Sequence, residues 1–541
     1  MKPLLLPIIS ICLLTSSCTN AQRSSAKEET TYVQGKNTQA KTVQGKPVPK
    51  RIFPANPSLF RNHLGVNAFE WDFSDDDHSV LSGPRKQVLR SFGVIRHYLD
   101  WSKLESEEGK YTFNPAHSGD WNYDMIYKWC HAEGIDLLAD IKTVPEWLLE
   151  SYPEDKRDGE NVPAPYGLNK SNPASYIKQA KLAFQFAARY GRNKSVPASL
   201  VKVNATPRWA DDPPNFVRIG LGYINYIECD NERDKTWKGP QALQSAEEYA
   251  ANMSAFYDGH MGKLGKNVGV KTADPTMKVV MGGLSNPDPK YVIKMIEWCK
   301  KNRGMNADGT VNLCFDVINY HAYNNDALSS GDAEVGKAPE LSQAARLADE
   351  FVAMAKKYAN GMEVWNTESG YDLNQKSPQR AIAIGKKPVA ITQADWILRS
   401  AFLYVRHGLS RSYFYMLDDV DEKSETQYSS SGLAEGHKKR PVTDYFTQTK
   451  KLMGNFQFKE NLSTDPVVDV YGLNDRKIFV MFVPDEKDRK AAYKLDLAGA
   501  TSATVYTLVP GAEKMSSKVV ATPKGILEIT LTETPVFVEK N

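Results

Sequence analysis

The amino-acid sequence predicts an α/β protein: a (β/α)8 TIM barrel followed by a small C-terminal antiparallel β-sandwich. Between residues 60 and 420, eight short apolar runs alternate with stretches of helical character, which is the order of elements in a closed parallel barrel. After residue 452, short runs of alternating apolar and polar residues are separated by turns, without a helical period. A chain of 541 residues, of which 41% are hydrophobic, is long enough to form both domains.

The eight predicted barrel strands are short and rich in apolar and β-branched residues. Between them, Ser245 with Glu248 and Thr392 with Asp395 have the spacing of a capping box, in which side chains bond the free amide groups of a first helical turn. We therefore expect helices to begin at Ser245 and at Thr392. The strands are predicted at residues 63–69, 93–99, 135–141, 224–229, 278–283, 315–323, 362–368 and 411–417.

The first residues have the pattern of an export signal. Met1 and Lys2 precede the apolar run PLLLPIISICLLTSSC, which is too short to cross a membrane as a helix. Its ending resembles a bacterial lipobox, in which the signal is cut before a cysteine that then carries lipid. This predicts a lipoprotein signal peptide over residues 1–17, lipidation of Cys18 and an exported protein anchored to the bacterial cell envelope, facing the periplasm or the surface. A plain signal peptide cut nearby is the alternative.

The remaining domain boundaries follow changes in composition. Residues 18–51 are polar, lack periodicity and contain VQGK twice, so we expect a flexible tether. The barrel is predicted over residues 52–452 and the β-sandwich over residues 453–541. The net charge of +3, without a block of lysine and arginine, argues against a nucleic acid or an anionic membrane surface as partner. Membrane contact is expected through the lipid anchor alone.

The cysteines lack the close paired spacing of a zinc site. Beyond the signal and Cys18, the sequence contains Cys130, Cys229, Cys299 and Cys314, which we interpret as buried thiols. One disulfide is the alternative in an exported protein. The sequence contains no HExxH, GxSxG or calcium-loop pattern, so no metal and no cofactor are expected.

Two glutamates stand at the ends of predicted strands. Glu232 follows the fourth strand in YIECDNERD, and Glu368 ends the seventh in MEVWNTE. In a (β/α)8 barrel these ends converge on one mouth, so residues far apart in sequence can face each other. Paired carboxylates are what glycosidic bond cleavage requires. A separation of about 5 to 5.5 Å predicts retention of configuration, and about 6.5 to 9.5 Å predicts inversion.

The pair Asn231–Glu232 after strand four, with Glu368 ending strand seven, resembles the signature of the clan A glycoside hydrolases over about residues 60 to 450. The segments DWSKLESEEGKYTF and VPEWLL and the trailing β-domain are most similar to family 39 and its relatives. The resemblance implies a retaining hydrolase that cleaves O-glycosidic bonds of oligo- or polysaccharides by double displacement. It assigns Glu232 as acid/base and Glu368 as nucleophile.

The same resemblance implies four substrate-site residues. Arg96, near the end of strand two, corresponds to an arginine that keeps the nucleophile ionised. Asn231 would hydrogen-bond a sugar 2-hydroxyl, and His321 with Tyr323 would lie beside the nucleophile.

Aromatic and basic residues in the loops add further expectations. Trp147, Trp209 and Trp237 lie near the predicted mouth, where flat rings can stack on sugars, and we assign Trp147 to the substrate site. Lys142 could meet the carboxylate or sulfate of an acidic sugar, with a solvated surface lysine as the alternative.

Two other functions fit the sequence. Asp230 before Asn231 and Arg233 after Glu232 depart from the clan pattern, which fits a glycan-binding surface lipoprotein with an inactive barrel. In the second alternative, the β-sandwich makes the contacts of a surface scaffold. Substituting both glutamates separates an enzyme, which loses turnover, from a binding protein, which keeps its affinity.

Overall fold

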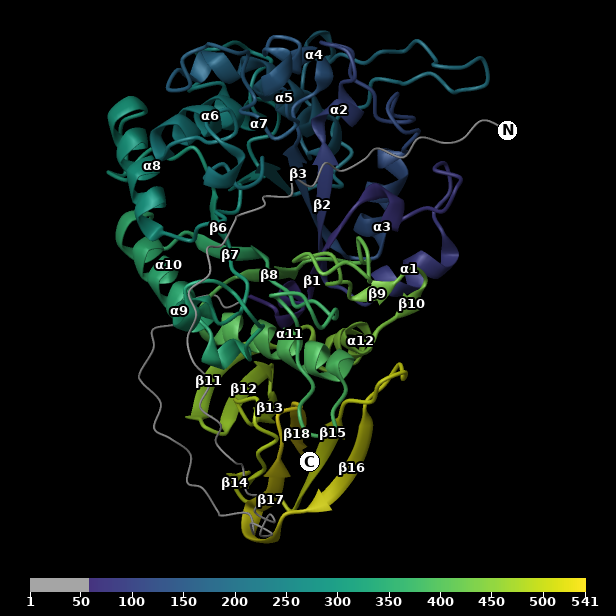
Figure 1. Ribbon diagram of the computed structural model, residues 1–541, viewed down its shortest axis with the longest axis vertical. Helices are drawn as coiled ribbons and strands as arrows, with labels where there is room; N and C mark the ends of the chain where they lie inside the picture. The colour runs from purple at the N-terminus through teal and green to yellow at the C-terminus, as the bar shows by residue number, and fades with distance from the viewer. Residues whose placement is uncertain (1–57) are drawn as a thin grey trace, which may run out of the picture. The chain divides into compact units, whose positions relative to one another are not determined.

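The computed structural model describes residues 58–541, and its central feature is a closed barrel of eight parallel strands (Figure 1). Neighbouring strands pair in sequence order, and the last closes on the first through Gly65 with Tyr413 and Val66 with Phe414. Each strand overlaps the run predicted for it, which confirms the predicted barrel. The strands are β1 (Gly65–Ala68), β2 (Val94–Asp100), β3 (Asp136–Lys142), β4 (Tyr226–Cys229), β5 (Lys278–Met281), β6 (Val317–His321), β7 (Glu363–Glu368) and β8 (Arg411–Phe414).

The N-terminal predictions lie outside the described residues. These are the signal peptide over residues 1–17, the lipidation of Cys18 and the tether over residues 18–51. Within residues 58–541, no helix is both long enough and apolar enough to cross a membrane. The four cysteines in this part of the chain are buried and free, as predicted, with the sulfur atoms of Cys299 and Cys314 3.4 Å apart.

Twelve α-helices lie in the described part of the chain, and they test the two predicted helix starts. Ser245 and Glu248 form the expected capping box at the start of α6. The prediction at Thr392 is wrong, because α11 already begins after Pro388 and Asp395 is buried against Lys387. The helices are α1 (Gly83–Leu89), α2 (Trp101–Leu104), α3 (Tyr123–Ala132), α4 (Glu146–Leu149), α5 (Ile177–Tyr190), α6 (Ala246–Asp258), α7 (Val270–Ala273), α8 (Pro289–Asn302), α9 (Ala327–Ser330), α10 (Ala344–Tyr358), α11 (Val389–Arg406) and α12 (Pro441–Met453).

Side chains inside the barrel form layers, because every second residue of a strand faces the same side. The layer nearest the N-terminal ends of the strands is apolar and is made by Val94, Leu138, Val280, Val317, Trp365 and Tyr413. The next inward-facing layer, two residues further along strands β2, β3, β4, β6 and β7, is polar and fully buried. It is made by Arg96, Asp140, Glu228, Asn319 and Thr367. Charged groups at this depth require partners. The polar layer forms the floor of the candidate site.

The C-terminal strands form antiparallel sheets, as predicted. A six-stranded sheet has the order β11-β12-β13-β18-β15-β16, and β14 pairs with β17 in a second sheet. Val470 and Met481 of the large sheet share a buried cluster with Leu495 and Leu527 of the small one, so the two sheets make a sandwich. The remaining strands are β9 (Ala434–Glu435), β10 (Lys438–Lys439), β11 (Gln457–Thr464), β12 (Val467–Leu473), β13 (Arg476–Phe482), β14 (Ala491–Asp496), β15 (Ser502–Thr507), β16 (Ser516–Ala521), β17 (Ile526–Leu531) and β18 (Val536–Lys540).

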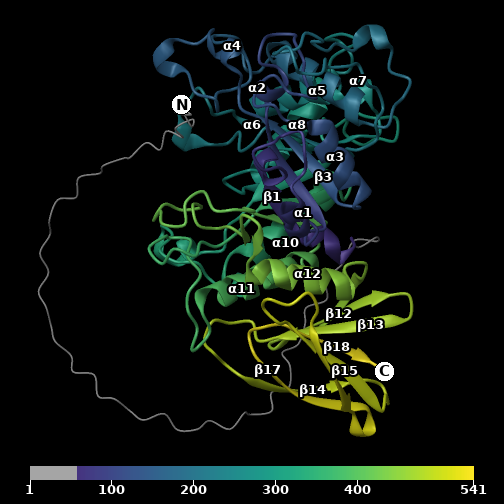
Figure 2. The same cartoon turned by 90° about the vertical axis from the view of Figure 1, so that its right-hand side faces the viewer.

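The large C-terminal sheet also packs on the helices of the barrel. Figures 1 and 2 both show α11 and α12 between the barrel strands and β11–β13. The ring of Tyr471 on β12 lies 5.4 Å from that of Phe60 and 5.9 Å from that of Phe402 on α11. Arg406 at the end of α11 pairs with the buried Asp469 at 2.5 Å. The part of the sheet formed by β12 and β13 is therefore covered on both faces.

Candidate active site

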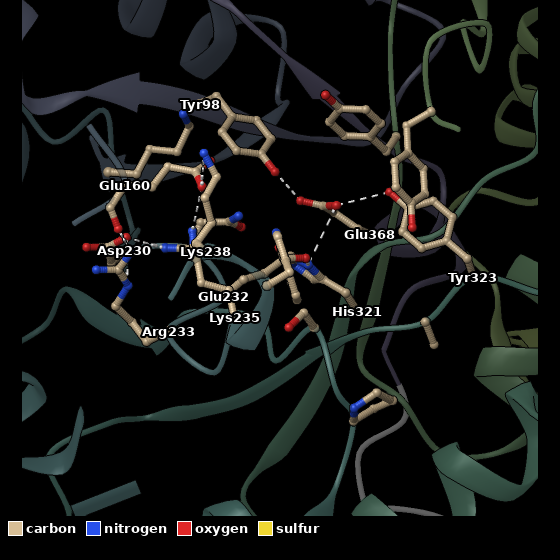
Figure 3. A pocket seen from close by; sticks show the side chains of 18 of the residues that line it. Tyr98, Glu160, Asp230, Glu232, Arg233, Lys235, Lys238, His321, Tyr323 and Glu368 are labelled. Atoms are coloured by element: carbon tan, nitrogen blue, oxygen red, sulfur yellow. Dashed lines mark hydrogen bonds and ion pairs between the residues drawn. The ribbon is translucent and has the colours of Figure 1, made fainter. Parts of the chain in front are cut away.

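The C-terminal ends of the barrel strands surround a cavity of about 550 Å³. Glu232 and Glu368, which the sequence placed at two strand ends, both line it (Figure 3). Asn231, His321 and Tyr323 line the same cavity. The structure therefore brings both predicted catalytic residues and three of the predicted substrate-site residues into one site.

The two glutamates lie close together. A carboxylate oxygen of Glu232 lies within 4.8 Å of a carboxylate oxygen of Glu368. His321 lies between them, with its Nδ1 2.7 Å from Glu232 and 3.6 Å from Glu368. This nearest-oxygen distance is closer to the short separation considered for paired carboxylates than to the long one.

A β-bulge directs Glu368 into the cavity. In the pairing of β6 with β7, Tyr320 opposes Asn366 but His321 opposes Glu368, so one residue of β7 is extra. Thr367 bonds Asn319 inside the barrel, and Glu368, the next residue, also faces inward. Strict alternation would have turned Glu368 outward, and the bulge reverses that direction.

Two left-handed backbone conformations direct Glu232. Asp230 has φ 68° and Glu232 has φ 51°, which residues other than glycine rarely adopt. Asp230 accepts a hydrogen bond from the backbone N–H of Asn231 at 2.7 Å, and Glu232 N–H donates to the carbonyl of Gly283 at 3.2 Å. These bonds hold the turn that brings the Glu232 carboxylate to His321.

Arg96 organises the floor of the site. Its guanidinium is fully buried and donates to Glu228 at 2.7 and 3.1 Å, and to Asp140 at 3.0 Å. It also donates to Glu368 at 2.8 Å and to the amide oxygen of Asn231 at 2.8 Å. The predicted contact between Arg96 and the strand-seven glutamate is thus present in the structure, and the same arginine orients Asn231.

The surroundings of Glu368 favour its ionised form. Burial raises the pKa of this carboxyl, but the charges of His321 and Arg96 and the hydroxyls of Tyr98 and Tyr323 outweigh burial and bring the pKa below its ordinary value. The Tyr98 hydroxyl donates to one carboxylate oxygen, and the Tyr323 hydroxyl donates to the other at 3.0 Å. A carboxylate held in this way is an ionised nucleophile in a fixed orientation.

His321 is favoured in its charged form. Burial lowers the pKa of the imidazole, but the negative charge of Glu368 and the bonded Glu232 raise it above the ordinary value. Its other ring nitrogen lies 3.0 Å from the Thr367 hydroxyl, which fixes the ring plane. The charged imidazole therefore offsets part of the repulsion between two neighbouring carboxylates.

The same three side chains raise the question of a metal ion. Glu232, His321 and Glu368 could each present one ligand atom to a common point. However, Arg96 already holds Glu368, and an imidazole must lose its extra proton before it can bind a metal. The donor set fits acid–base chemistry better than a resident cation.

Trp147 lies outside the cavity lining, so the geometry gives no support to its predicted role. Its indole N–H donates to the carbonyl of Glu105 at 2.9 Å, and its ring packs edge-on against Trp101 at 5.5 Å. Lys178 Nζ lies 5.0 Å from the centre of the ring. Trp147 therefore anchors the segment after β2, whereas Trp237, which is 63% exposed, does line the cavity.

Several site residues escaped the sequence analysis. Tyr98, Tyr415 and Tyr428 line the cavity, and Glu228 and Asp140 pair with Arg96 beneath it. A usable signal was present for the acids, because YIEC and LLADI each place one carboxylate in an otherwise apolar strand. A charge in such a run must have a buried partner.

Comparisons with known proteins identify the fold. No model of a known protein family matches the sequence, and no curated protein matches it. Among solved structures, a family 39 glycoside hydrolase from the gut symbiont Bacteroides cellulosilyticus WH2 is 15% identical, with a TM-score of 0.57 over 89% of this chain and 82% of that one. This chain shares that enzyme's fold.

Two other similar structures have different specificities. A GH30 endoxylanase from Clostridium papyrosolvens C71 is 12% identical, with a TM-score of 0.52 over 90% of this chain and 97% of that chain. An α-L-arabinofuranosidase from Thermotoga maritima is also 12% identical, with a TM-score of 0.51 and the same shares of the two chains. At these identities the likeness concerns the fold, so any function must be argued from the site itself.

Proposed function

We propose that the protein is a retaining glycoside hydrolase that cleaves O-glycosidic bonds of oligo- or polysaccharides. The observation that carries the proposal is the approach of Glu232 and Glu368 to within 4.8 Å in a cavity at the mouth of the barrel. The short separation favours double displacement over direct attack by water. The fold shared with solved glycoside hydrolases supports the same reaction class.

In the proposed reaction, the ionised Glu368 attacks the anomeric carbon while Glu232 donates a proton to the leaving oxygen. The bond to the leaving group breaks and an ester between Glu368 and the sugar forms. Glu232 then removes a proton from water, which attacks the same carbon and releases Glu368. Arg96, Tyr98 and Tyr323 orient the carboxylate throughout.

Product stereochemistry tests this proposal. We expect an aryl glycoside that the protein hydrolyses to release a sugar with the anomeric configuration of the substrate, because two displacements invert the carbon twice. Proton NMR in the first minutes, before mutarotation, measures the configuration. A panel of aryl α- and β-glycosides identifies the substrate to use. First release of the inverted anomer would contradict the assignment of Glu368 as nucleophile.

A second prediction concerns pH. In Tyr323→Phe, one of the hydrogen bonds that lower the pKa of Glu368 is absent, so this pKa rises. Activity needs the ionised form and falls as pH drops through the pKa, so the acid limb of kcat/KM should move to higher pH. A hydrogen bond to a charged group contributes about 1.5–3 kcal/mol, so kcat/KM should also fall about 10- to 100-fold.

Tyr428→Phe is the matched control, since it removes another hydroxyl from the same cavity and lies next to Tyr323. Its acid limb should stay close to that of the unmodified protein. Identical pH profiles for Tyr323→Phe and the unmodified protein would show that this hydroxyl does not act on the nucleophile.

The departures that motivated the inactive-barrel alternative have a structural role. Arg233 is buried and donates to the backbone carbonyls of Asn161 and Glu160 at 2.9 and 2.7 Å. It therefore ties the loop after β3 to the loop after β4 without contacting Glu368. This arrangement supports an intact site.

Export and lipid attachment at Cys18 belong to the same proposal. A hydrolase tethered to the cell envelope acts on glycans outside the cytoplasm. Membrane fractionation of Cys18→Ala tests the attachment, and recovery of that variant with the membranes would refute it.

A further inference from the structure

One wall of the cavity carries four cationic side chains, Lys142, Arg233, Lys235 and Lys238, which we call the cationic wall. Lys142 is the last residue of β3, and the other three follow β4. Figure 3 shows Arg233, Lys235 and Lys238 gathered on the side of Glu232 that lies away from Glu368 and Tyr323. The wall therefore adjoins the reacting centre.

Lys235 is the least compensated member of the wall. Its side chain is only 3% exposed, and its nearest carboxylate oxygen, on Glu160, lies 3.7 Å away. Within residues 58–541, no acceptor lies within hydrogen-bond distance of its ammonium group. Burial, and secondly the charge of Arg233, lower the pKa of this lysine. The Lys235 side chain is thus nearly buried while its ammonium group has no protein acceptor in the described part of the chain, and an anion in the cavity would supply one.

The acid nearest to Lys235 is already shared. Glu160 lies 3.3 Å from Lys238 as well as 3.7 Å from Lys235. Burial raises the pKa of Glu160, but Lys235, Lys238 and Lys142 together bring it below the ordinary value. One partly exposed carboxylate thus serves three ammonium groups, although Lys142 also pairs with Asp100 and Lys238 also pairs with Asp158 at 3.2 Å.

An exposed ring lies beside these charges. Trp237 stands between Lys235 and Lys238 in sequence, lines the cavity and is 63% exposed. A flat aromatic face can stack on a sugar ring, while adjacent ammonium groups bind an anionic substituent of that ring. A neutral sugar could stack on the ring and offer hydroxyl oxygens to Lys235, but it would leave the positive charge without a counter-charge.

We propose that the substrate is an anionic glycan, with a carboxylate or sulfate of one sugar bound by Lys235 and Lys238 beside Glu232. This inference rests on the proposed glycoside hydrolase function and names its substrate class. Uronic acids and sulfated sugars both carry the anionic group that the two lysines would bind. The experiment below distinguishes a carboxylate from a sulfate.

Binding to matched polysaccharides tests the inference. The full chain carrying Glu368→Gln, which slows hydrolysis, is titrated calorimetrically with polygalacturonate, alginate, chondroitin sulfate and heparin. Neutral xylan, carboxyl-reduced polygalacturonate and desulfated chondroitin are the comparisons. We expect at least one acidic polymer to bind at least tenfold more tightly than the neutral ones. Loss of binding on carboxyl reduction or on desulfation identifies the anionic group.

Variants of the wall then locate the contact. In the same background, Lys235→Gln should weaken binding of the preferred polymer at least tenfold and reduce its dependence on salt. Lys238→Gln is a second test of the same binding loss. The Lys238 side chain is 34% exposed, so this substitution disturbs the packing less than one at the buried Lys235. Lys518→Gln, on the exposed strand β16, is the matched control and should bind like the parent.

Three results would overturn the inference: no binding of any acidic polymer, equal or tighter binding of the neutral ones, or unchanged binding by both wall variants. Thermal unfolding verifies that each variant is folded. The proposed hydrolase function fails differently, because Glu368→Ala would then hydrolyse an aryl glycoside as fast as the unmodified protein.

Discussion

Replacing Glu368 by alanine is expected to lower kcat/KM for an aryl glycoside by on the order of 10⁴-fold or more, the range found when a catalytic nucleophile is removed. The variant keeps Glu232 and the binding cavity, but no group remains that can attack the anomeric carbon. The loss should appear in kcat, because the ester cannot form. Initial rates measured over a range of substrate concentrations separate kcat from KM.

Small anions provide a positive test of the same variant. The space left by the carboxymethyl group lies beside Arg96 and Tyr323, which can hold an anion such as azide. Azide would displace the leaving group once, so the product should be a glycosyl azide of inverted configuration. Glu363→Ala, at the opposite end of β7, is the control and should remain active without azide. A glycosyl azide of retained configuration would assign the nucleophile elsewhere.

Replacing Glu232 by alanine should give a loss that depends on the leaving group. For alkyl glycosides, whose leaving oxygen needs a proton, we expect kcat/KM to fall about 10²- to 10⁴-fold. For a 2,4-dinitrophenyl glycoside, which leaves without protonation, kcat/KM should change far less. Water attack is also slowed without a general base, so this substrate should give a burst of dinitrophenol followed by slow turnover.

The two substrates serve as each other's control in this experiment. Equal losses for both would mean that Glu232 affects binding or folding rather than proton transfer. His321 is bonded to Glu232 at 2.7 Å, so its titration is also expected to change in the variant. An NMR titration of the imidazole should show a lower pKa, because one of the two carboxylates that raise it has been removed.

The barrel was predictable because its strands are buried on both faces. Such strands are nearly continuous apolar runs, and they stand out between helical stretches. Their ends locate the mouth, so Glu232 and Glu368 could be paired from position alone. The bulge that turns Glu368 inward has no local signal, because the pairing of β7 with β6 sets it. The left-handed turn at Asp230 depends both on its own side chain, which bonds the N–H of Asn231, and on the carbonyl of Gly283.

The wrong helix start at Thr392 and the position of Trp147 outside the cavity lining have a common physical origin. Thr392 and Asp395 have the spacing of a helix start, but the partly buried Lys387 and Thr534 hold the buried Asp395 carboxylate inside α11. Trp147 follows a strand end that lies at the mouth of the barrel. Its indole N–H nevertheless donates to the backbone carbonyl of Glu105, in the segment after β2. In each case a contact with a distant part of the chain decided the outcome. The burial of Lys235 also depends on a distant contact, because the loop after β4 that carries it lies against Glu160 in the loop after β3.

The two-sided covering of β12 and β13 limits how this chain can be shortened. Cutting the polypeptide after α12 would expose the rings of Phe60 and Phe402 to water and leave the guanidinium of Arg406 without Asp469. A catalytic fragment made for crystallisation or for fusion to other modules would therefore aggregate unless those positions were redesigned with polar side chains. Any engineered version should carry the whole of residues 58–541 as one cassette.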